Sequence, residues 1–233
     1  MEGSSKIEVP ELVEGPGVGT MSKSSRRQSS ATKSLDSIRD DGNTLTAGVD
    51  EAGRGCLAGP VVAAAVILDP ESPIEGLNDS KVLSESSRNS LYSQIIKNSK
   101  AVGIAIVAPS TIERLNILHA SLYAMRRSVE KLGLRPDHVW VDGNKTPEMG
   151  DIPVQAFVKG DALHACISAA SIVAKVVRDT QMKKYNDRYP GYGLDRHKGY
   201  ATAAHYDALL ALGPCPIHRK GFKLVRQETL FEL

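Results

Sequence analysis

The sequence has little of several features that would place it in a specialised class of protein. Its 233 residues contain only three cysteines, no two of them in a C-x-x-C pair: Cys56, Cys166 and Cys215. That odd, scattered set argues against a disulfide framework or a zinc site and favours a reducing compartment. No apolar run approaches the roughly 20 residues that span a bilayer, and no signal segment opens the chain. We therefore expect a cytoplasmic protein with no membrane partner.

Neither sign of charge dominates, with 29 Lys and Arg against 27 Asp and Glu. Any affinity for a polyanion must therefore come from where the basic residues lie. The hydrophobic content of 41% is enough to bury a core. Residues 1–43 are rich in Ser and Gly without hydrophobic periodicity, which predicts a disordered tail. We expect one folded domain over residues 44–224 and a C-terminal tail over 225–233.

Strand-like and helix-like patterns alternate through the folded part. Short apolar runs rich in β-branched residues predict strands at 44–50, 61–68, 101–108, 138–142 and 152–158. Ser110 and Glu113 form a capping box ahead of helical apolar spacing that reaches Val129. A long helix rich in small residues is predicted from Asp161, and a short one over 202–212. This alternation indicates the α/β class.

A glycine-rich turn, Gly53-Arg54-Gly55, follows the first predicted strand. Such a turn could be a phosphate-binding loop. However, Pro60 and a β-branched run come next, where a dinucleotide-binding fold needs the start of a helix to face the phosphate. The sequence therefore excludes that kind of loop.

Three aspartates lie at the end of a predicted strand or just before a helix: Asp50, Asp142 and Asp161. Ligands and catalytic groups gather at such places in open α/β sheets. Each of the last two also has a structural alternative. Asp142 opens a D-G-N turn sequence, and Asp161 could cap the long helix. The residues alone leave both alternatives open.

Asp50 and Glu51 are harder to explain structurally, because adjacent carboxylates repel each other unless a cation lies between them. Neighbouring strand residues point to opposite faces, so both can reach one site only if the strand breaks there. Residues 52–55 supply a break. Oxygen ligands without a Cys or His set favour Mg²⁺ or Mn²⁺ over zinc.

Seven stretches of the chain resemble bacterial ribonuclease HII. They are DEAGRGCLAGPVVAAAVIL from Asp50, NDSKVLS at 78–84, ERLNILHA at 113–120, VDGN around Asp142, KGDALHACISAASIVAKVVRD at 159–179, HKGYATAAH at 197–205 and the late HRKGF. Together they cover nearly all of 44–224. The resemblance implies an RNase H-like fold, a five-stranded mixed sheet flanked by helices, with a C-terminal helical segment that closes over a duplex.

The same resemblance implies a function. The chain would be an endonuclease that hydrolyses the phosphodiester 5′ of a ribonucleotide, leaving 3′-hydroxyl and 5′-phosphate ends. Its substrates would be RNA/DNA hybrids and single ribonucleotides embedded in duplex DNA. One alternative is a catalytically idle hybrid-binding module, which the complete acidic quartet argues against. The other is a metal nuclease of this fold that cuts DNA.

The family's functional residues map onto this chain as follows. The acidic quartet, implied to hold two divalent ions, Mg²⁺ or Mn²⁺, falls on Asp50, Glu51, Asp142 and Asp161. The resemblance implies that the turn of Gly53, Arg54 and Gly55 senses the 2′-hydroxyl, which distinguishes RNA from DNA. It also implies that Tyr200 stacks on the sugar at the junction between ribonucleotide and deoxyribonucleotide.

Basic residues and tyrosines gather towards the C-terminus. Residues 175–198 contain seven basic and three acidic residues, of which a solvated helix face explains about half and phosphate contacts the rest. Lys175 is expected to point towards the site and contact substrate. The Q-x-x-L-F pattern of Gln227, Leu230 and Phe231 resembles bacterial sliding-clamp binding peptides, although an ordinary amphipathic terminus is the favoured interpretation. We expect a monomer.

Overall fold

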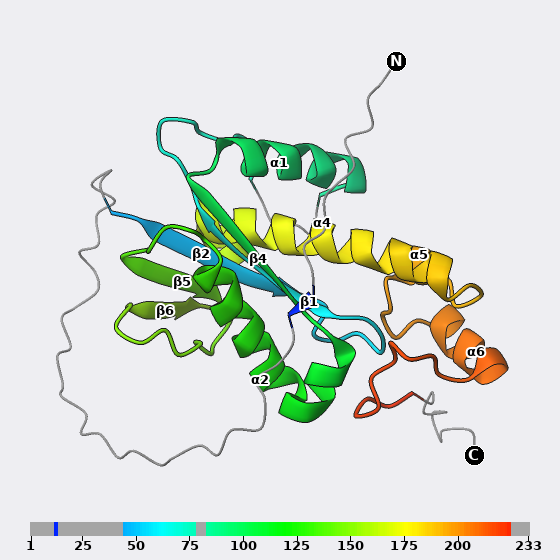
Figure 1. Ribbon diagram of the computed structural model, residues 1–233. Coiled ribbons are helices and arrows are strands. Elements are labelled where there is room, and N and C mark those ends of the chain that lie inside the picture. Colours follow the sequence, from blue (N-terminus) through cyan, green and yellow to red (C-terminus); the bar gives the residue numbers. More distant parts are fainter. Residues whose placement is uncertain (1–11, 14–43, 78–82, 225–233) are drawn as a thin grey trace, which may run out of the picture.

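The computed structural model describes residues 12–13, 44–77 and 83–224 (Figure 1). The tails expected at 1–43 and 225–233 lie outside these residues, apart from Leu12 and Val13. Most of the NDSKVLS motif and the clamp-like residues Gln227, Leu230 and Phe231 also lie outside them.

A mixed sheet forms the centre of the molecule. Its five main strands are β2 (Thr46–Ala52), β3 (Val61–Ile67), β4 (Ala101–Val107), β5 (His138–Asp142) and β6 (Val154–Phe157). The two-residue strand β1 (Leu12–Val13) adds to one edge, giving the order β1-β4-β3-β2-β5-β6. The α/β class and the five-stranded mixed sheet predicted from the sequence are confirmed.

The carboxyl ends of the three parallel strands β2, β5 and β6 lie at the same end of the sheet, which is called here the carboxyl edge. Strand β3 pairs antiparallel with both β2 and β4. On the other side of β2, β5 pairs parallel with β2, and β6 pairs parallel with β5. In the parallel pair β2 and β5, Val49 lies opposite Val141. Asp50 and Asp142 are the next residues along these neighbouring strands, so the register places them side by side at the same edge.

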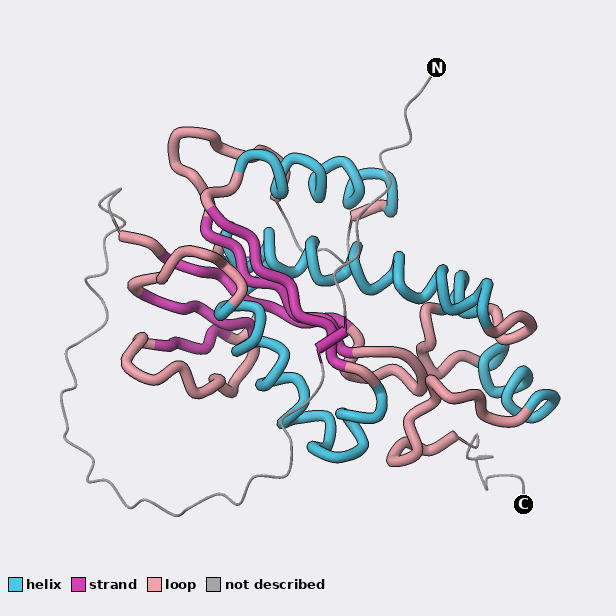
Figure 2. Tube along the Cα trace, viewed as in Figure 1, coloured by secondary structure: helices cyan, strands magenta, loops and turns pink. Residues whose placement is uncertain are grey.

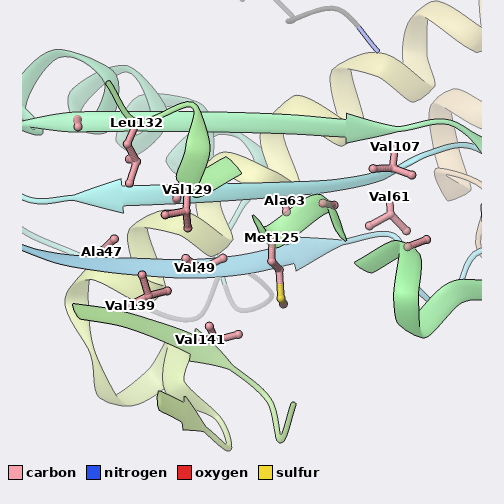
Figure 3. Close-up of a cluster of buried hydrophobic side chains, with 14 of the residues drawn as sticks. Ala47, Val49, Val61, Ala63, Val107, Met125, Val129, Leu132, Val139 and Val141 are labelled. Atoms are coloured by element: carbon pink, nitrogen blue, oxygen red, sulfur yellow. The ribbon is translucent and has the colours of Figure 1, made fainter. Parts of the chain in front are cut away.

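Helices cover both faces of the sheet (Figures 1 and 2). Helix α2 (Pro109–Glu130) packs on one face, where apolar side chains from the sheet and the helix form a core cluster (Figure 3). Helix α4 (Ala165–Arg188) packs on the other face, together with α1 (Glu85–Asn98). Because both faces are covered, β3 is buried along its whole length, as its unbroken apolar run VVAAAVI predicts.

Small residues bring α4 close to β2. A Cβ atom on Gly48 would lie 2.1 Å from the carbonyl carbon of Cys166, so only glycine permits this approach. The close packing continues along α4 to Ser171, whose side chain hydrogen-bonds Asp50. The small residues of the long helix therefore serve to position the end of β2.

Helix α2 begins differently from the sequence-based expectation. Its N-cap is Ala108, Pro109 occupies the first turn, and no side chain caps it, so the predicted Ser110-Glu113 capping box is wrong. The helix is also interrupted at Asn116, where φ is 62°. The Asn116 side-chain oxygen accepts hydrogen bonds from the amides of Leu118 and His119, at 3.0 and 3.2 Å, and so caps the second segment internally.

The helix expected from Asp161 is divided in two. A short helix α3 (Gly160–Leu163) precedes α4, and His164 separates them. Asp161 lies inside the first turn of α3, whose N-cap is Lys159. The structural alternative that Asp161 caps the long helix is therefore wrong.

The C-terminal part packs at the end of α4. It contains α5 (Leu194–His197) and α6 (Ala203–Leu212), followed by an irregular segment that returns to the sheet. His218 in that segment forms a β-bridge with Ala58, just after the glycine-rich turn. Among the described residues, no helix has the length and apolar character needed to cross a membrane.

Candidate active site

Asp50 lies at the carboxyl end of β2 and is only 6% exposed. Its Oδ1 accepts the amide of Glu51 at 2.6 Å, and its side chain also hydrogen-bonds Ser171 of α4. Burial raises the pKa of Asp50 well above its usual value, and the negative charges of Glu51 and Asp142 raise it further. The protein thus holds this carboxylate in an environment that disfavours its charge.

Glu51 follows on the same strand with a different partner. Arg54 Nη1 lies 3.2 Å from Glu51 Oε1. Burial raises the pKa of Glu51, although the charge of Arg54 opposes that rise. Strand β2 pairs regularly through both acids and ends at Ala52, so their side chains leave opposite faces of the strand. The expected break comes too late to turn both onto one face, but both remain at the edge where Asp142 lies.

Asp142 and Asp161 reach that edge from the next two elements. Asp142 is the last residue of β5, and its Oδ1 accepts the amide of Gly160 at 2.7 Å. Asp161 follows Gly160 directly and is buried. Gly143, with φ of 108°, turns the chain immediately after Asp142, so the predicted turn and a role in the site are compatible.

The donor chemistry of this edge suits a hard divalent cation. The four acids offer only oxygen ligands, and a cation would offset the repulsion between Asp50, Glu51 and Asp142. Among the described residues, no three His, Cys, Asp or Glu side chains lie close enough to hold a metal ion as they stand. Glu51 would have to leave Arg54 to become a ligand. The residues therefore fit a metal by their chemistry and need a side-chain rearrangement to bind it.

The glycine-rich turn lies directly beside the acids. Gly53 is buried with φ of 97°, and a Cβ there would lie 2.0 Å from Arg178 Nε, so both conformation and packing require glycine. Gly55 is exposed, and a Cβ on it would meet nothing within 4 Å. Arg54 is half-exposed between them. The outer face of the turn is therefore open.

Tyr200 lies against the residue that follows the turn. Burial raises the pKa of Tyr200, and the proximity of the buried Cys56 raises it further. Tyr200 is 41% exposed, and Lys175 Nζ and Arg178 Cζ each lie 5.7 Å from the centroid of its ring. Lys175 also bonds Asp179 Oδ1 at 2.8 Å. The structure thus brings Tyr200 and Lys175 together next to the turn.

A pair of buried histidines holds the main chain of Tyr200. His205 Nδ1 donates to the Tyr200 carbonyl at 2.9 Å, so its Nε2 accepts from His218 Nε2 at 3.0 Å. The Nδ1 of His218 in turn accepts the amide of Cys215 at 2.9 Å. This series of hydrogen bonds requires both imidazole rings to be neutral. The pKa of His205 agrees with that requirement, because burial lowers it to about 4.

Sequence reasoning missed two residues that support the site, Arg178 and Arg219. Both are fully buried and hydrogen-bond the main chain around the turn. Arg178 had one usable signal, since it is a charged residue that directly follows the apolar pair Val176-Val177 of α4. Arg219 lies in the HRKGF stretch that resembles the family, but its main-chain partners leave no trace in a sequence. Ser171, expected only to pack the helix, also contacts Asp50.

Comparisons with known proteins agree on one family. The family model described as Ribonuclease HII matches residues 47–225. A protein named Ribonuclease HII from Maricaulis maris is 57% identical over 186 residues, which cover 79% of this chain and 85% of the relative. Its counterpart from Idiomarina loihiensis is 55% identical over 183 residues, which cover 78% of this chain and 97% of the relative.

Two solved structures share the fold at 28% sequence identity. The ribonuclease H2 of Pyrococcus horikoshii has a TM-score of 0.65 and covers 78% of this chain and 95% of its own. The structure of the PCNA:RNase HII complex from Archaeoglobus fulgidus has a TM-score of 0.67 and covers 80% of this chain and 98% of its own. The similarity therefore spans the described domain in both sequence and structure.

Proposed function

Since this chain belongs to the ribonuclease HII family and is a ribonuclease H, we propose that it hydrolyses the phosphodiester on the 5′ side of a ribonucleotide in a duplex. The products would carry 3′-hydroxyl and 5′-phosphate ends. The substrates would be RNA/DNA hybrids and duplex DNA with single embedded ribonucleotides. The observation that supports this most is the position of Asp50, Glu51 and Asp142 at one sheet edge beside the Gly53–Gly55 turn.

We assign the metal site to the four acids, Asp50, Glu51, Asp142 and Asp161. Bound there, two Mg²⁺ or Mn²⁺ ions would activate the attacking water and stabilise the departing 3′ oxygen. The protein prepares this site through fixed contacts, since the Glu51 amide orients Asp50 and the Gly160 amide orients Asp142. Hydrogen bonds from neighbouring groups to metal-binding carboxylates hold those carboxylates in the orientation that the metal needs.

Glu51 and Arg54 would change partners when substrate binds. In the structure they form an ion pair, with Glu51 mostly buried and Arg54 half-exposed. If Glu51 turns to the metal site, the Arg54 guanidinium becomes available for a phosphate of the substrate, which it can bind through two parallel hydrogen bonds. The pair would thus keep Arg54 beside the acids until a duplex arrives.

Recognition of the ribonucleotide is assigned to the turn and to Tyr200. The exposed amides of the turn would bind the 2′-hydroxyl, and Tyr200 would stack on the sugar at the junction. Lys175, next to Tyr200, would contact a phosphate. The proximity of Tyr200 to Cys56 supports this division, since it places the stacking ring next to the turn.

We further propose that residues 44–224 form the catalytic domain of a cytoplasmic monomer. The relative solved as a PCNA:RNase HII complex makes a clamp contact of this chain testable, with Gln227, Leu230 and Phe231 as the candidate peptide. Binding of the full chain to its own sliding clamp, with a chain that ends at residue 224 as the control, decides the question. Absence of binding by the full chain would leave the terminus as an ordinary amphipathic segment.

The proposed reaction is tested by cutting end-labelled duplexes of one sequence. One duplex carries a single ribonucleotide, one is all DNA, and one is a continuous RNA/DNA hybrid, each assayed with Mg²⁺ and with EDTA. We expect cleavage of the first and third only, in Mg²⁺ only, immediately 5′ of a ribonucleotide. Cleavage of the DNA duplex would indicate a DNA nuclease, and binding without cleavage would indicate an idle module.

A further inference from the structure

Two arginines from distant parts of the chain converge beneath the turn. Arg178 lies on α4, Arg219 lies in the segment after α6, and both are 0% exposed. Their guanidinium groups make three and five hydrogen bonds respectively, all to main-chain carbonyl oxygens. The acceptors are Ala58, Pro60 and Lys198 for Arg178, and Gly53, Arg54, Gly59 and Pro60 for Arg219, with Gly59 accepting twice.

Stability alone does not explain this pair. None of the ion pairs among the described residues involves Arg178 or Arg219. Burial, followed by the like charge of Arg178, lowers the pKa of Arg219 to about 10. Apolar side chains commonly fill such a space without the cost of removing two charges from water. The arrangement therefore points to a geometric purpose.

Arg219 sets the direction of the peptide groups in the turn. Its Nη2 bonds the Gly53 carbonyl at 2.7 Å, and its Nη1 bonds the Arg54 carbonyl at 2.9 Å. In a trans peptide the carbonyl and the following amide point in opposite directions. The amides of Arg54 and Gly55 must therefore point away from Arg219, towards the open outer face.

Those two amides have the properties of donors kept for a ligand. Within the described part of the chain, neither of them donates a hydrogen bond to another residue's main chain. Both residues are exposed, and the position of a Cβ on Gly55 is clear of other atoms within 4 Å. Adjacent outward amides form a site for an oxygen atom of the substrate.

Arg178 links the segment that follows the turn to the segment that precedes Tyr200. It donates to the carbonyls of Ala58 at 3.2 Å and Pro60 at 3.1 Å on one side, and to that of Lys198 at 3.0 Å on the other. Lys198 lies two residues before Tyr200, whose ring centroid is 5.7 Å from Arg178 Cζ. A single buried, hydrogen-bonded side chain thus connects the segments that carry the two recognition elements.

We propose that Arg178 and Arg219 are positioning residues for ribose recognition: Arg219 aims the amides of Arg54 and Gly55, and Arg178 sets their spacing from Tyr200. The proposal rests on the proposed function of the turn. Neither arginine contacts the acids through a hydrogen bond or ion pair among the described residues. Loss of either guanidinium should therefore impair substrate selection more than bond cleavage.

The test uses Arg178→Lys and Arg219→Lys, which keep a positive charge but lose the planar fork. The control is Arg135→Lys, because Arg135 forms an exposed ion pair with Asp151 away from the site. For each folded variant, kcat/KM is measured on a single-ribonucleotide duplex and on a continuous hybrid. We expect kcat/KM to fall at least about tenfold on the single-ribonucleotide duplex and no more than about threefold on the hybrid. The hybrid is less affected because it offers many ribonucleotides at which the enzyme can bind and cut.

Equal falls on both substrates, or no fall in either variant, would overturn the proposal and leave the arginines with a structural role. A wild-type enzyme that cuts neither substrate would instead overturn the proposed function, so the two failures are distinguishable.

A measurement on the wild type decides the matter if the lysine variants do not fold. The amide NMR signals of Arg54 and Gly55 are followed in EDTA, where no cleavage is expected. A duplex with a single ribonucleotide is added in one titration, and an all-DNA duplex of the same sequence in the other. We expect both signals to shift with the ribonucleotide-containing duplex and less with the all-DNA duplex. Identical responses to the two duplexes would contradict an outward pair of amides that recognises ribose.

Discussion

The amide nitrogen of Gly160 lies 2.7 Å from Asp142 Oδ1, which joins the first turn of α3 to the end of β5. The contact places Asp161, the next residue along the chain, close to Asp142. A Cβ on Gly160 would lie 2.7 Å from Ile167 Cδ1 and 3.1 Å from Phe157 Cβ, so glycine is needed for this approach.

Replacement of Gly160 by alanine should therefore disturb the site more than the fold. The Ile167 side chain can move, at a cost of about 1 kcal/mol in the free energy of unfolding. Displacement of the Gly160 amide should lower kcat about tenfold, because small misplacements near the reacting atoms are costly. Both quantities are compared with Gly221→Ala, whose Cβ meets nothing within 4 Å. Normal kcat in Gly160→Ala would show that the contact does not orient Asp142.

Asp50→Asn and Asp142→Asn should each lose nearly all cleavage while still binding duplex. Each substitution removes a charge from the proposed metal site, and a loss on the order of 10³-fold is typical when preorganised electrostatic stabilisation is broken. The thermal midpoint of Asp50→Asn in EDTA should not fall, because the buried Asp50 carboxylate is repelled by Glu51 and Asp142. Retention of more than about a tenth of the wild-type rate in Mg²⁺ would count against the quartet.

The fold was predictable where hydrophobic pattern alone decides it. The run HVWVD forms β5 at the expected residues, and the unbroken run of β3 is buried on both faces. The capping box failed because Pro109 starts α2 one residue before Ser110. The acids were noticed from their places at strand ends, but the partners of Asp50 and Arg219 depend on three-dimensional packing that no local pattern reports.

His205 should make the fold sensitive to mild acid. Its pKa is about 4 in the folded chain, against an ordinary value of 6.5. As pH falls from about 6.5 towards 4, the unfolded chain takes up a proton that the folded chain cannot, so the free energy of unfolding should fall. Urea unfolding between pH 7 and 4.5 is compared with His205→Gln, which should lack this component. Identical pH dependence in the two proteins would show that His205 is not held neutral.

Deletion of residues 1–43 should leave cleavage unchanged. Among the deleted residues, the structure describes only the two of β1, which pair with Ile106 and Val107 at the edge of the sheet. Loss of so short a strand should move the thermal midpoint by no more than about 2 °C. A large drop in the midpoint, measured against the full chain under the same conditions, would show that the segment belongs to the folded domain.

The central claim is that the acids cut and the turn with Tyr200 selects, so damage to each should have a different signature. The most direct measurement is kcat/KM of Arg54→Ala, Tyr200→Ala and Asp50→Asn on a single-ribonucleotide duplex and on a continuous hybrid. Asp50→Asn should lower kcat/KM on both substrates by the same large factor. Arg54→Ala and Tyr200→Ala should lower kcat/KM on the single-ribonucleotide duplex about tenfold more than kcat/KM on the hybrid. A lost charged or stacking contact is worth roughly 1–3 kcal/mol. Equal losses on both substrates for Arg54→Ala and Tyr200→Ala would contradict the claim.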